Sequence, residues 1–139
     1  MVYPHPFASP QYEVLHTSEL YIPDGTLVFS MPELVRGIIE PQQFFHLAYY
    51  EWARVYQVVY PGQAQPDLGW EALEVIGGFS QAKLEAFVGL TGLNTAAITV
   101  ALYFTHGEAF LRQAAGTYHR ITEVLRPPTE FGPPATTLL

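Results

Sequence analysis

The feature that most constrains the fold of this chain is a run of apolar residues spaced three and four positions apart in its last third. The run consists of Ala97, Val100, Phe104, Gly107, Leu111, Ala114, Tyr118, Ile121 and Leu125. This spacing places side chains on one face of an α-helix, so it predicts helix from about Thr95 to Arg126. A single helix of that length would be about 48 Å long. Thr105 and Glu108 around Gly107 form a capping box at which the helix could break.

A second amphipathic helix is predicted from Pro41 to Tyr60, because proline suits the first turn of a helix and Pro61-Gly62 ends it. One broad arc of this helix is aromatic and aliphatic, and it holds Phe44, Phe45, Ala48, Tyr49, Trp52, Val55, Tyr56, Val59 and Tyr60. The other arc is polar and holds Gln43, His46, Tyr50, Arg54 and Gln57. Glu51 lies at the border of the aromatic arc, where we expect it to pair with Arg54. Alternatively, the pKa of this carboxylate is raised and it serves as an acid or base.

Shorter elements are predicted before and between these helices. One β-hairpin is expected near residues 18–30, because Pro23-Asp24-Gly25 forms a tight turn between two apolar runs. Short helices are expected after residues that can cap them, namely Ser30, Asp67, Ser80 and, for the last helix, Asn94. Prolines mark residues 1–11 and 127–139, which we expect to be extended arms around one helical domain, residues 12–126. The predicted fold class is therefore mainly α: a small helical bundle with one N-terminal β-hairpin and extended Pro-rich N- and C-terminal arms.

Composition argues against several kinds of function. The chain has 139 residues, enough for one domain, and no cysteine, which excludes disulfides, thiolate metal sites and thiol nucleophiles. Its formal net charge of -7 has the wrong sign for a phosphate-binding surface, so we expect no direct contact with nucleic acid. Residues 86–107 are uncharged but contain several Gly and Thr residues, so we expect no membrane span. No signal peptide is recognised after Met1, which predicts synthesis in the cytoplasm and leaves the final location unknown.

Few residues are arranged for catalysis or metal binding. His119 and Glu123 share a helix face, but the charged neighbours on that face predict surface ion pairs rather than a metal site. Gly77-Gly78 lacks the lysine of a phosphate-binding loop, and no serine stands in a nucleophile elbow. We therefore expect no catalytic, cofactor-binding or metal-binding residues and no enzymatic activity.

Sparse charge and abundant aromatic residues favour a protein whose surface is covered by partners. Charged residues make up 14% of the chain, where about 25% is typical. The preferred hypothesis is a structural or assembly subunit, as a homo-oligomer or with other subunits, for example in a virion or filament, with arms that dock on neighbouring subunits. The expected interface residues are Phe45, Tyr49, Trp52, Tyr56, Leu111, Tyr118, Ile121 and Leu125.

Two alternatives come from other classes of protein. A small helical ligand-binding protein or enzyme would use the aromatic face of helix 41–60 and would need a closed pocket of a few hundred Å³. A monomeric regulator that docks on one partner protein would expose a single apolar patch. The sequence leaves open whether the aromatic face is core or interface.

Overall fold

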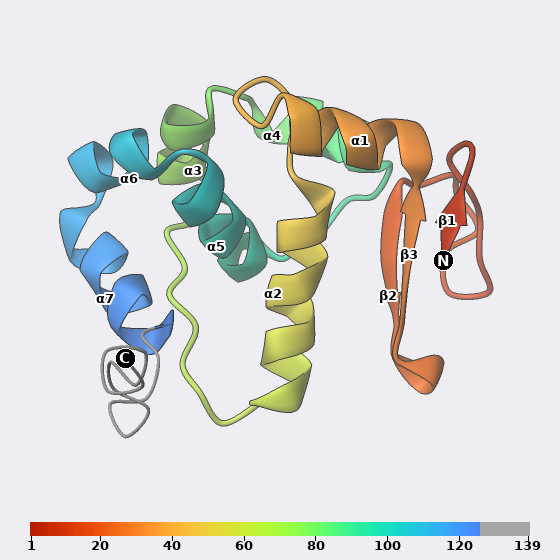
Figure 1. Cartoon of the computed structure of the whole chain (residues 1–139), viewed down its shortest axis with the longest axis horizontal. Helices are drawn as coiled ribbons and strands as arrows, with labels where there is room; N and C mark the ends of the chain where they lie inside the picture. Colours follow the sequence, from red (N-terminus) through yellow and green to blue (C-terminus); the bar gives the residue numbers. More distant parts are fainter. Residues whose placement is uncertain (126–139) are drawn as a thin grey trace, which may run out of the picture.

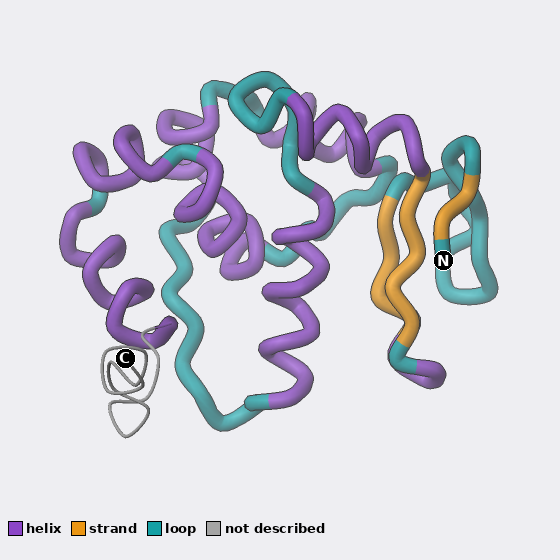
Figure 2. The backbone as a smooth tube through the Cα atoms, viewed as in Figure 1, coloured by secondary structure: helices purple, strands orange, loops and turns teal. Residues whose placement is uncertain are grey.

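Seven α-helices and a small three-stranded sheet make up residues 1–125, which are the residues that the computed structural model describes (Figure 1; Figure 2). The strands are β1 (Val2–Tyr3), β2 (Ser18–Tyr21) and β3 (Thr26–Ser30). The helices are α1 (Met31–Ile39), α2 (Leu47–Val59), α3 (Trp70–Gly77), α4 (Gln81–Val88), α5 (Thr95–Thr105), α6 (Gly107–Gln113) and α7 (Ala115–Leu125). The prediction of a mainly helical chain is confirmed. The predicted arm 127–139 lies outside the described residues.

The sheet contains the predicted hairpin and one strand that was not predicted. β2 and β3 pair antiparallel, with Ser18 opposite Phe29 and Tyr21 opposite Thr26. A turn of 3-10 helix joins them, and Gly25 ends that turn with a φ of 62°, a conformation that glycine adopts without strain. The strand order is β1-β3-β2, so β3 is the central strand. Figure 1 shows this sheet at one end of the molecule, α6 and α7 at the other, and α2 between them.

The N-terminal arm packs on its own chain, contrary to the expectation for residues 1–11. β1 pairs in parallel with β3, with Val2 opposite Phe29. Phe7 then forms a β-bridge with His16 and is buried. Within this arm residues 2–3 form a strand and bends follow at residues 4–5 and 10–11, and the open edge of β3 supplies hydrogen-bonding partners for the strand within the same molecule. The idea that this arm is free to dock on a neighbouring subunit is therefore wrong for β1 and Phe7.

Several predicted helix starts are confirmed and others are not. The side chains of Ser80 and Asn94 accept hydrogen bonds from the backbone N–H groups three residues later, so both cap their helices as predicted. Ser30 stands at the N-cap of α1, but its hydroxyl bonds to a carboxylate in the first turn instead of to the backbone. Asp67 does not cap α3 directly, because the N-cap is Gly69, whose N–H donates to the Asp67 carboxylate.

The helix predicted over residues 41–60 is shorter than expected, since α2 begins only at Leu47. His46 caps it, with the Tyr49 N–H donating to His46 Nδ1 over 3.1 Å. The chain before this cap crosses α1 so closely that a Cβ on Gly37 would collide with the carbonyl oxygen of Phe45. Glycine is therefore needed at that crossing.

The last third of the chain forms three helices instead of one. The backbone leaves helical geometry at His106 (φ −128°, ψ 45°) and again at Ala114 (φ −150°, ψ 61°). The first break confirms the alternative that the sequence offered near Gly107. No capping box forms there, because the Thr105 hydroxyl donates to the Ala101 carbonyl (3.1 Å). The second break has no proline or glycine at its centre, so no local signal in the sequence predicts it.

These breaks divide the predicted apolar run, which does not form one continuous face. Ile121 is 2% exposed, whereas Leu111 is 41% exposed. Phe110, which was outside the predicted run, is fully buried instead. The core lies where α2, α3, α5 and α6 meet, and its most buried members include Leu47, Leu73, Val88, Ala97, Ile98, Ala101, Leu102 and Phe110.

Candidate functional site

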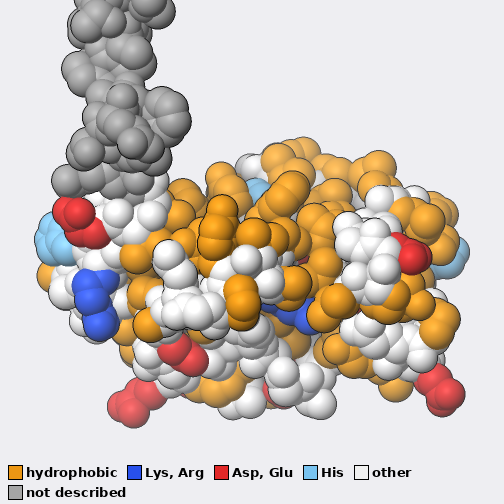
Figure 3. Space-filling view, turned by 90° about the horizontal axis from the view of Figure 1, so that it is seen from below, with side chains coloured by type: hydrophobic (Ala, Val, Ile, Leu, Met, Phe, Trp, Pro, Cys, Tyr) orange, Lys and Arg blue, Asp and Glu red, His pale blue; other side chains and the backbone are white. Residues whose placement is uncertain are grey.

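α2 buries Tyr50, which was predicted on the polar arc, and Glu51, which was predicted at the border of the aromatic arc, and it exposes much of the aromatic arc. Tyr50 is 3% exposed and Glu51 is fully buried, whereas Trp52 is 61% exposed. Burial of the two polar side chains is tolerated because each has a partner. The Asn94 N–H donates to the Tyr50 hydroxyl (3.0 Å), and Arg54 Nη1 donates to Glu51 Oε1 (2.7 Å). Seen from below, the molecule carries a broad expanse of hydrophobic side chains with few charges among them (Figure 3).

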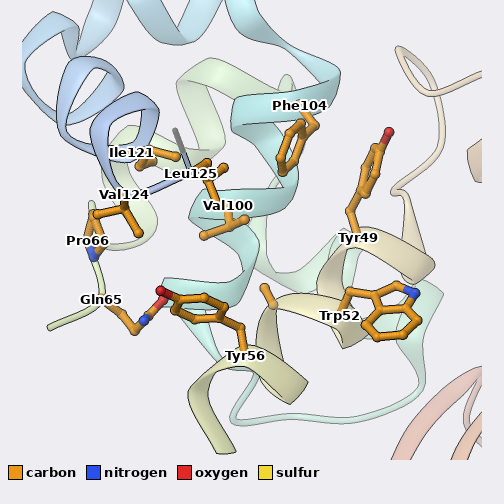
Figure 4. Close-up of a pocket in the computed structure, with 11 residues that line it drawn as sticks. Tyr49, Trp52, Tyr56, Gln65, Pro66, Val100, Phe104, Ile121, Val124 and Leu125 are labelled. Atoms are coloured by element: carbon orange, nitrogen blue, oxygen red, sulfur yellow. The ribbon is translucent and has the colours of Figure 1, made fainter. Parts of the chain in front are cut away.

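The exposed aromatic arc forms one wall of a groove between α2, α5, α7 and the segment that precedes α3. We call this the aromatic groove, and it has a volume of about 170 Å³ (Figure 4). Its lining residues are Tyr49, Trp52, Ala53, Tyr56, Gln65, Pro66, Val100, Phe104, Ile121, Val124 and Leu125. None of these residues is charged, and the polar side-chain groups among them are the Gln65 amide, the Trp52 indole N–H and the hydroxyls of Tyr49 and Tyr56. The groove is therefore suited to an apolar or aromatic occupant.

The walls of the aromatic groove are held in place by ring contacts and hydrogen bonds. The rings of Tyr49 and Phe104 stack with centroids 4.9 Å apart, which joins α2 to α5. The hydroxyl groups of Tyr103 and Thr122 lie 2.7 Å apart and join α5 to α7. The segment before α3 is tied to α5 by a 2.8 Å hydrogen bond from the Thr95 hydroxyl to an Asp67 carboxylate oxygen. The groove is thus preformed rather than dependent on closure around a ligand.

Five of the eight residues predicted to form an interface line the aromatic groove, namely Tyr49, Trp52, Tyr56, Ile121 and Leu125. The other three lie elsewhere. Phe45 is buried in the core, Tyr118 packs against the Phe110 ring with centroids 6.2 Å apart, and Leu111 faces solvent on α6. The grouping arises because the second break lets α7 pack on α5, where it faces α2 across the groove.

Sequence reasoning missed other residues of the aromatic groove. Gln65 and Pro66 come from the segment between α2 and α3, and no sequence signal places that segment beside α7. Val100 and Phe104 belonged to the predicted apolar run but were not assigned to the interface. Their step of four along α5 was the signal that could have placed them there.

A buried histidine–carboxylate contact lies beside the N-terminal arm. His16 Nε2 and Glu19 Oε1 are 2.7 Å apart, and both side chains are shielded from solvent. The Ser9 hydroxyl donates to the same carboxylate oxygen (2.6 Å), and His16 Nδ1 lies 2.8 Å from the Val14 carbonyl. The histidine and the carboxylate therefore satisfy each other's hydrogen-bonding groups, and they fasten the N-terminal arm to β2.

Glu51 pairs with Arg54, as expected, and its pKa is also raised. Burial raises the pKa of the Glu51 carboxyl, and the positive charge of Arg54 offsets part of that effect. The Ser18 hydroxyl also faces the carboxylate and lowers its pKa, although neither Ser18 Oγ nor Glu51 Oε2 completes a hydrogen bond within the described residues. Because Glu51 is fully buried, a substrate has no access to it, which supports a structural role for the pair rather than an acid or base role.

A second hollow lies beyond the N-terminus of α2, with a volume of about 430 Å³. Four phenylalanines line it together with the single cation Lys83, and they are Phe44, Phe45, Phe79 and Phe87. Phe44 and Phe45 belong to the arc predicted for helix 41–60, but the early residues of that arc are turned away from the aromatic groove. The two hollows are therefore separate surfaces.

Within residues 1–125, no group of three or more His, Asp or Glu side chains is arranged to hold a metal ion. In the same part of the chain, no helix combines the length and the apolar character needed to cross a membrane. Comparisons with protein-family models, with curated proteins and with solved structures find no match to this chain.

Proposed function

We propose that this chain is a structural or assembly subunit that binds other protein chains through the aromatic groove, in a homo-oligomer or with other subunits. The observation that carries this proposal is the row of aromatic side chains that α2 leaves at the surface. Trp52 is the most exposed of them, although its side chain is large and apolar. Tryptophan and tyrosine are the residues most often found at the energetic centre of protein interfaces.

Apolar surface continues beyond the aromatic groove, which supports a partner larger than a small molecule. Val59 and Tyr60 are exposed farther along the α2 segment. Within the groove itself, Phe104 on α5 and Val124 on α7 are also exposed. An exposed apolar area of this kind is typical of protein–protein contacts on otherwise soluble domains.

The size of the groove separates this proposal from ligand binding at the same place. A pocket for a small ligand commonly has a volume of roughly 300–1,000 Å³, whereas the aromatic groove has about 170 Å³ and opens to the surface. It is therefore better suited to one or two inserted side chains of a partner than to a whole ligand.

The oligomeric state of the purified full-length chain tests the proposal. Size-exclusion chromatography with light scattering is expected to give a mass at least twice the 15.5 kDa of one chain. Trp52→Glu is expected to shift this mass to that of the single chain, because it places a charge in an apolar contact. Discrete oligomers would indicate a closed assembly, and a mass that grows with concentration would indicate a filament.

A matched control uses Val75→Glu, because Val75 is also an exposed apolar residue but lies on α3, outside the aromatic groove. This variant is expected to keep the mass of the wild type, and circular dichroism checks that both variants keep their helices. A wild-type chain that stays monomeric at every concentration would contradict self-assembly. Equal effects of the two substitutions would contradict a role for the groove.

Binding of a small aromatic carboxylate is a second candidate function, and it is favoured by the volume and lining of the hollow beside Lys83. A cation next to several phenylalanine rings suits a ligand with one acidic and one apolar end. Thermal unfolding with 1-naphthoate as the probe is expected to show stabilisation that Lys83→Met removes. Unchanged melting of the wild type at millimolar naphthoate would count against this function.

A further inference from the structure

We infer that the occupant of the aromatic groove is the proline-rich C-terminal segment, residues 127–139, of a second copy of this chain. This inference rests on the proposed function, because it names the partner that the groove would bind. Each copy would then donate one segment and receive one, which is a closed and symmetric exchange between two molecules.

The chemistry of the segment matches the chemistry of the groove. Residues 127–139 contain four prolines, Pro127, Pro128, Pro133 and Pro134, and one aromatic residue, Phe131. Proline-rich chain favours the polyproline II conformation, which docks on grooves lined with aromatic side chains and loses little conformational entropy on binding. The aromatic groove supplies Tyr49, Trp52 and Tyr56 at steps of three and four along α2, so their rings follow one another on one side of the helix.

The charge of the C-terminal segment is also compatible with the uncharged lining of the aromatic groove. Glu130 is the only charged side chain among residues 127–139, and no charged side chain lines the groove. Contact between the two would bury apolar surface on both sides without burying an unpaired charge, apart from one carboxylate that can remain in solvent.

The place where the segment begins favours a neighbouring copy over the same molecule. Leu125 lines the groove, so the segment starts at the rim of that groove (Figure 4). Pro127 and Pro128 follow at once in the sequence, and consecutive prolines favour extended chain at and just before them. A tight turn directly after Leu125 is therefore disfavoured, and such a turn is what binding to the same molecule's groove would need. At about 3.1 Å per residue, thirteen extended residues reach about 40 Å, which is enough to span to a second molecule.

Cross-linking between two full-length variants tests this inference directly. Because the natural chain has no cysteine, each introduced thiol is unique. We would mix Gln65→Cys, at the groove, with Ala135→Cys, in the segment, and add a short bismaleimide. The expected result is a mixed cross-linked dimer, with a yield at least tenfold above that of Val75→Cys mixed with Ala135→Cys.

The chain that carries both Gln65→Cys and Ala135→Cys distinguishes the two possible sources of the segment. Closed exchange between two copies predicts cross-linked dimers from this double variant. An internally cross-linked monomer, with no mixed dimer from the single variants, would show that the segment folds onto its own groove and would overturn the inference.

A second measurement separates failure of this inference from failure of the proposed function. Phe131→Ser in the full chain is expected to weaken self-association at least tenfold in analytical ultracentrifugation, and Thr136→Ser is its matched control. If Trp52→Glu gives monomers while Phe131→Ser and the cross-linking mixture match their controls, the groove binds a different partner surface and the inference is wrong. If Trp52→Glu also leaves the assembly intact, the proposed function is wrong as well.

Discussion

Replacing Ile121 by alanine is expected to destabilise this chain far more than replacing Leu111 by alanine, although the sequence places both residues on the same apolar run. Ile121 is 2% exposed and Leu111 is 41% exposed. At about 0.8 kcal/mol per buried CH₂, truncation of Ile121 loses about 2.4 kcal/mol of transfer free energy. The cavity left behind raises the cost to about 3–4 kcal/mol.

The corresponding cost for Leu111 is smaller for two reasons. Only about three fifths of that side chain is removed from water, so the transfer loss is about 1.4 kcal/mol. No enclosed cavity forms at the surface, so no further cost is added. We therefore expect the two variants to differ by about 2 kcal/mol in the free energy of unfolding.

Urea unfolding followed by circular dichroism measures this difference, at a protein concentration where light scattering finds one oligomeric state for all samples. Equal slopes of free energy against urea concentration would show that both variants unfold from a similar native state. Equal losses of stability at Ile121 and Leu111 would refute the reasoning. That result would mean that residues 95–125 form one helix with a continuous apolar face, and that the breaks at His106 and Ala114 are wrong.

Three further perturbations follow from local geometry and burial. Gly89→Ala is expected to lower the free energy of unfolding by about 3 kcal/mol or more, measured by thermal or urea unfolding, because Gly89 has a φ of 87° and a Cβ there would collide with backbone atoms. Gly25 has a φ of 62° but open space around it, so Gly25→Ala is expected to lower it by only about 1 kcal/mol. Burial raises the folded-state pKa of Glu51, so above a pH of about 4.5 the folded chain keeps a proton that the unfolded chain releases. The free energy of unfolding of the wild type is therefore expected to fall as the pH rises from about 4.5, and Glu51→Gln is expected to remove that fall. Burial lowers the pKa of His46, so the free energy of unfolding is expected to fall as the pH drops below about 6.5. His46→Asn keeps an acceptor for the Tyr49 N–H and is expected to reduce that fall, measured by urea titrations at pH 7.5 and 5.5. A pH dependence that is the same in both variants as in the wild type would contradict these assignments.

The local signals that begin and end elements could be read from the sequence. Ser80 and Asn94 cap helices as predicted, and the Pro23-Asp24-Gly25 turn joins two paired strands. Such signals work over a few residues, since a cap or a tight turn depends only on neighbours along the chain. They also gave the mainly helical character of the chain and its general division into elements.

The aromatic residues of α2 were identified from the sequence, but their environment was not. Helical periodicity placed Tyr50 on the polar arc and Trp52 on the aromatic arc, yet Tyr50 is buried and Trp52 is exposed. That outcome depends on Asn94 and Arg54, which satisfy the polar groups of the buried face. Whether a polar face can be buried is decided by partners, and Asn94 is distant in sequence from α2, so the periodicity of one helix cannot decide it.

The groove itself is a product of tertiary structure alone. Its walls come from α2, α5, α7 and the segment around Pro66, and they meet because the chain breaks at His106 and Ala114. Contacts between segments far apart in the sequence also place β1 beside β3. The sequence by itself determined which residues are apolar and where most helices can start; tertiary packing decided which of those apolar residues are covered. The reason is that burial depends on the total contact between segments far apart in the chain, which no local pattern contains.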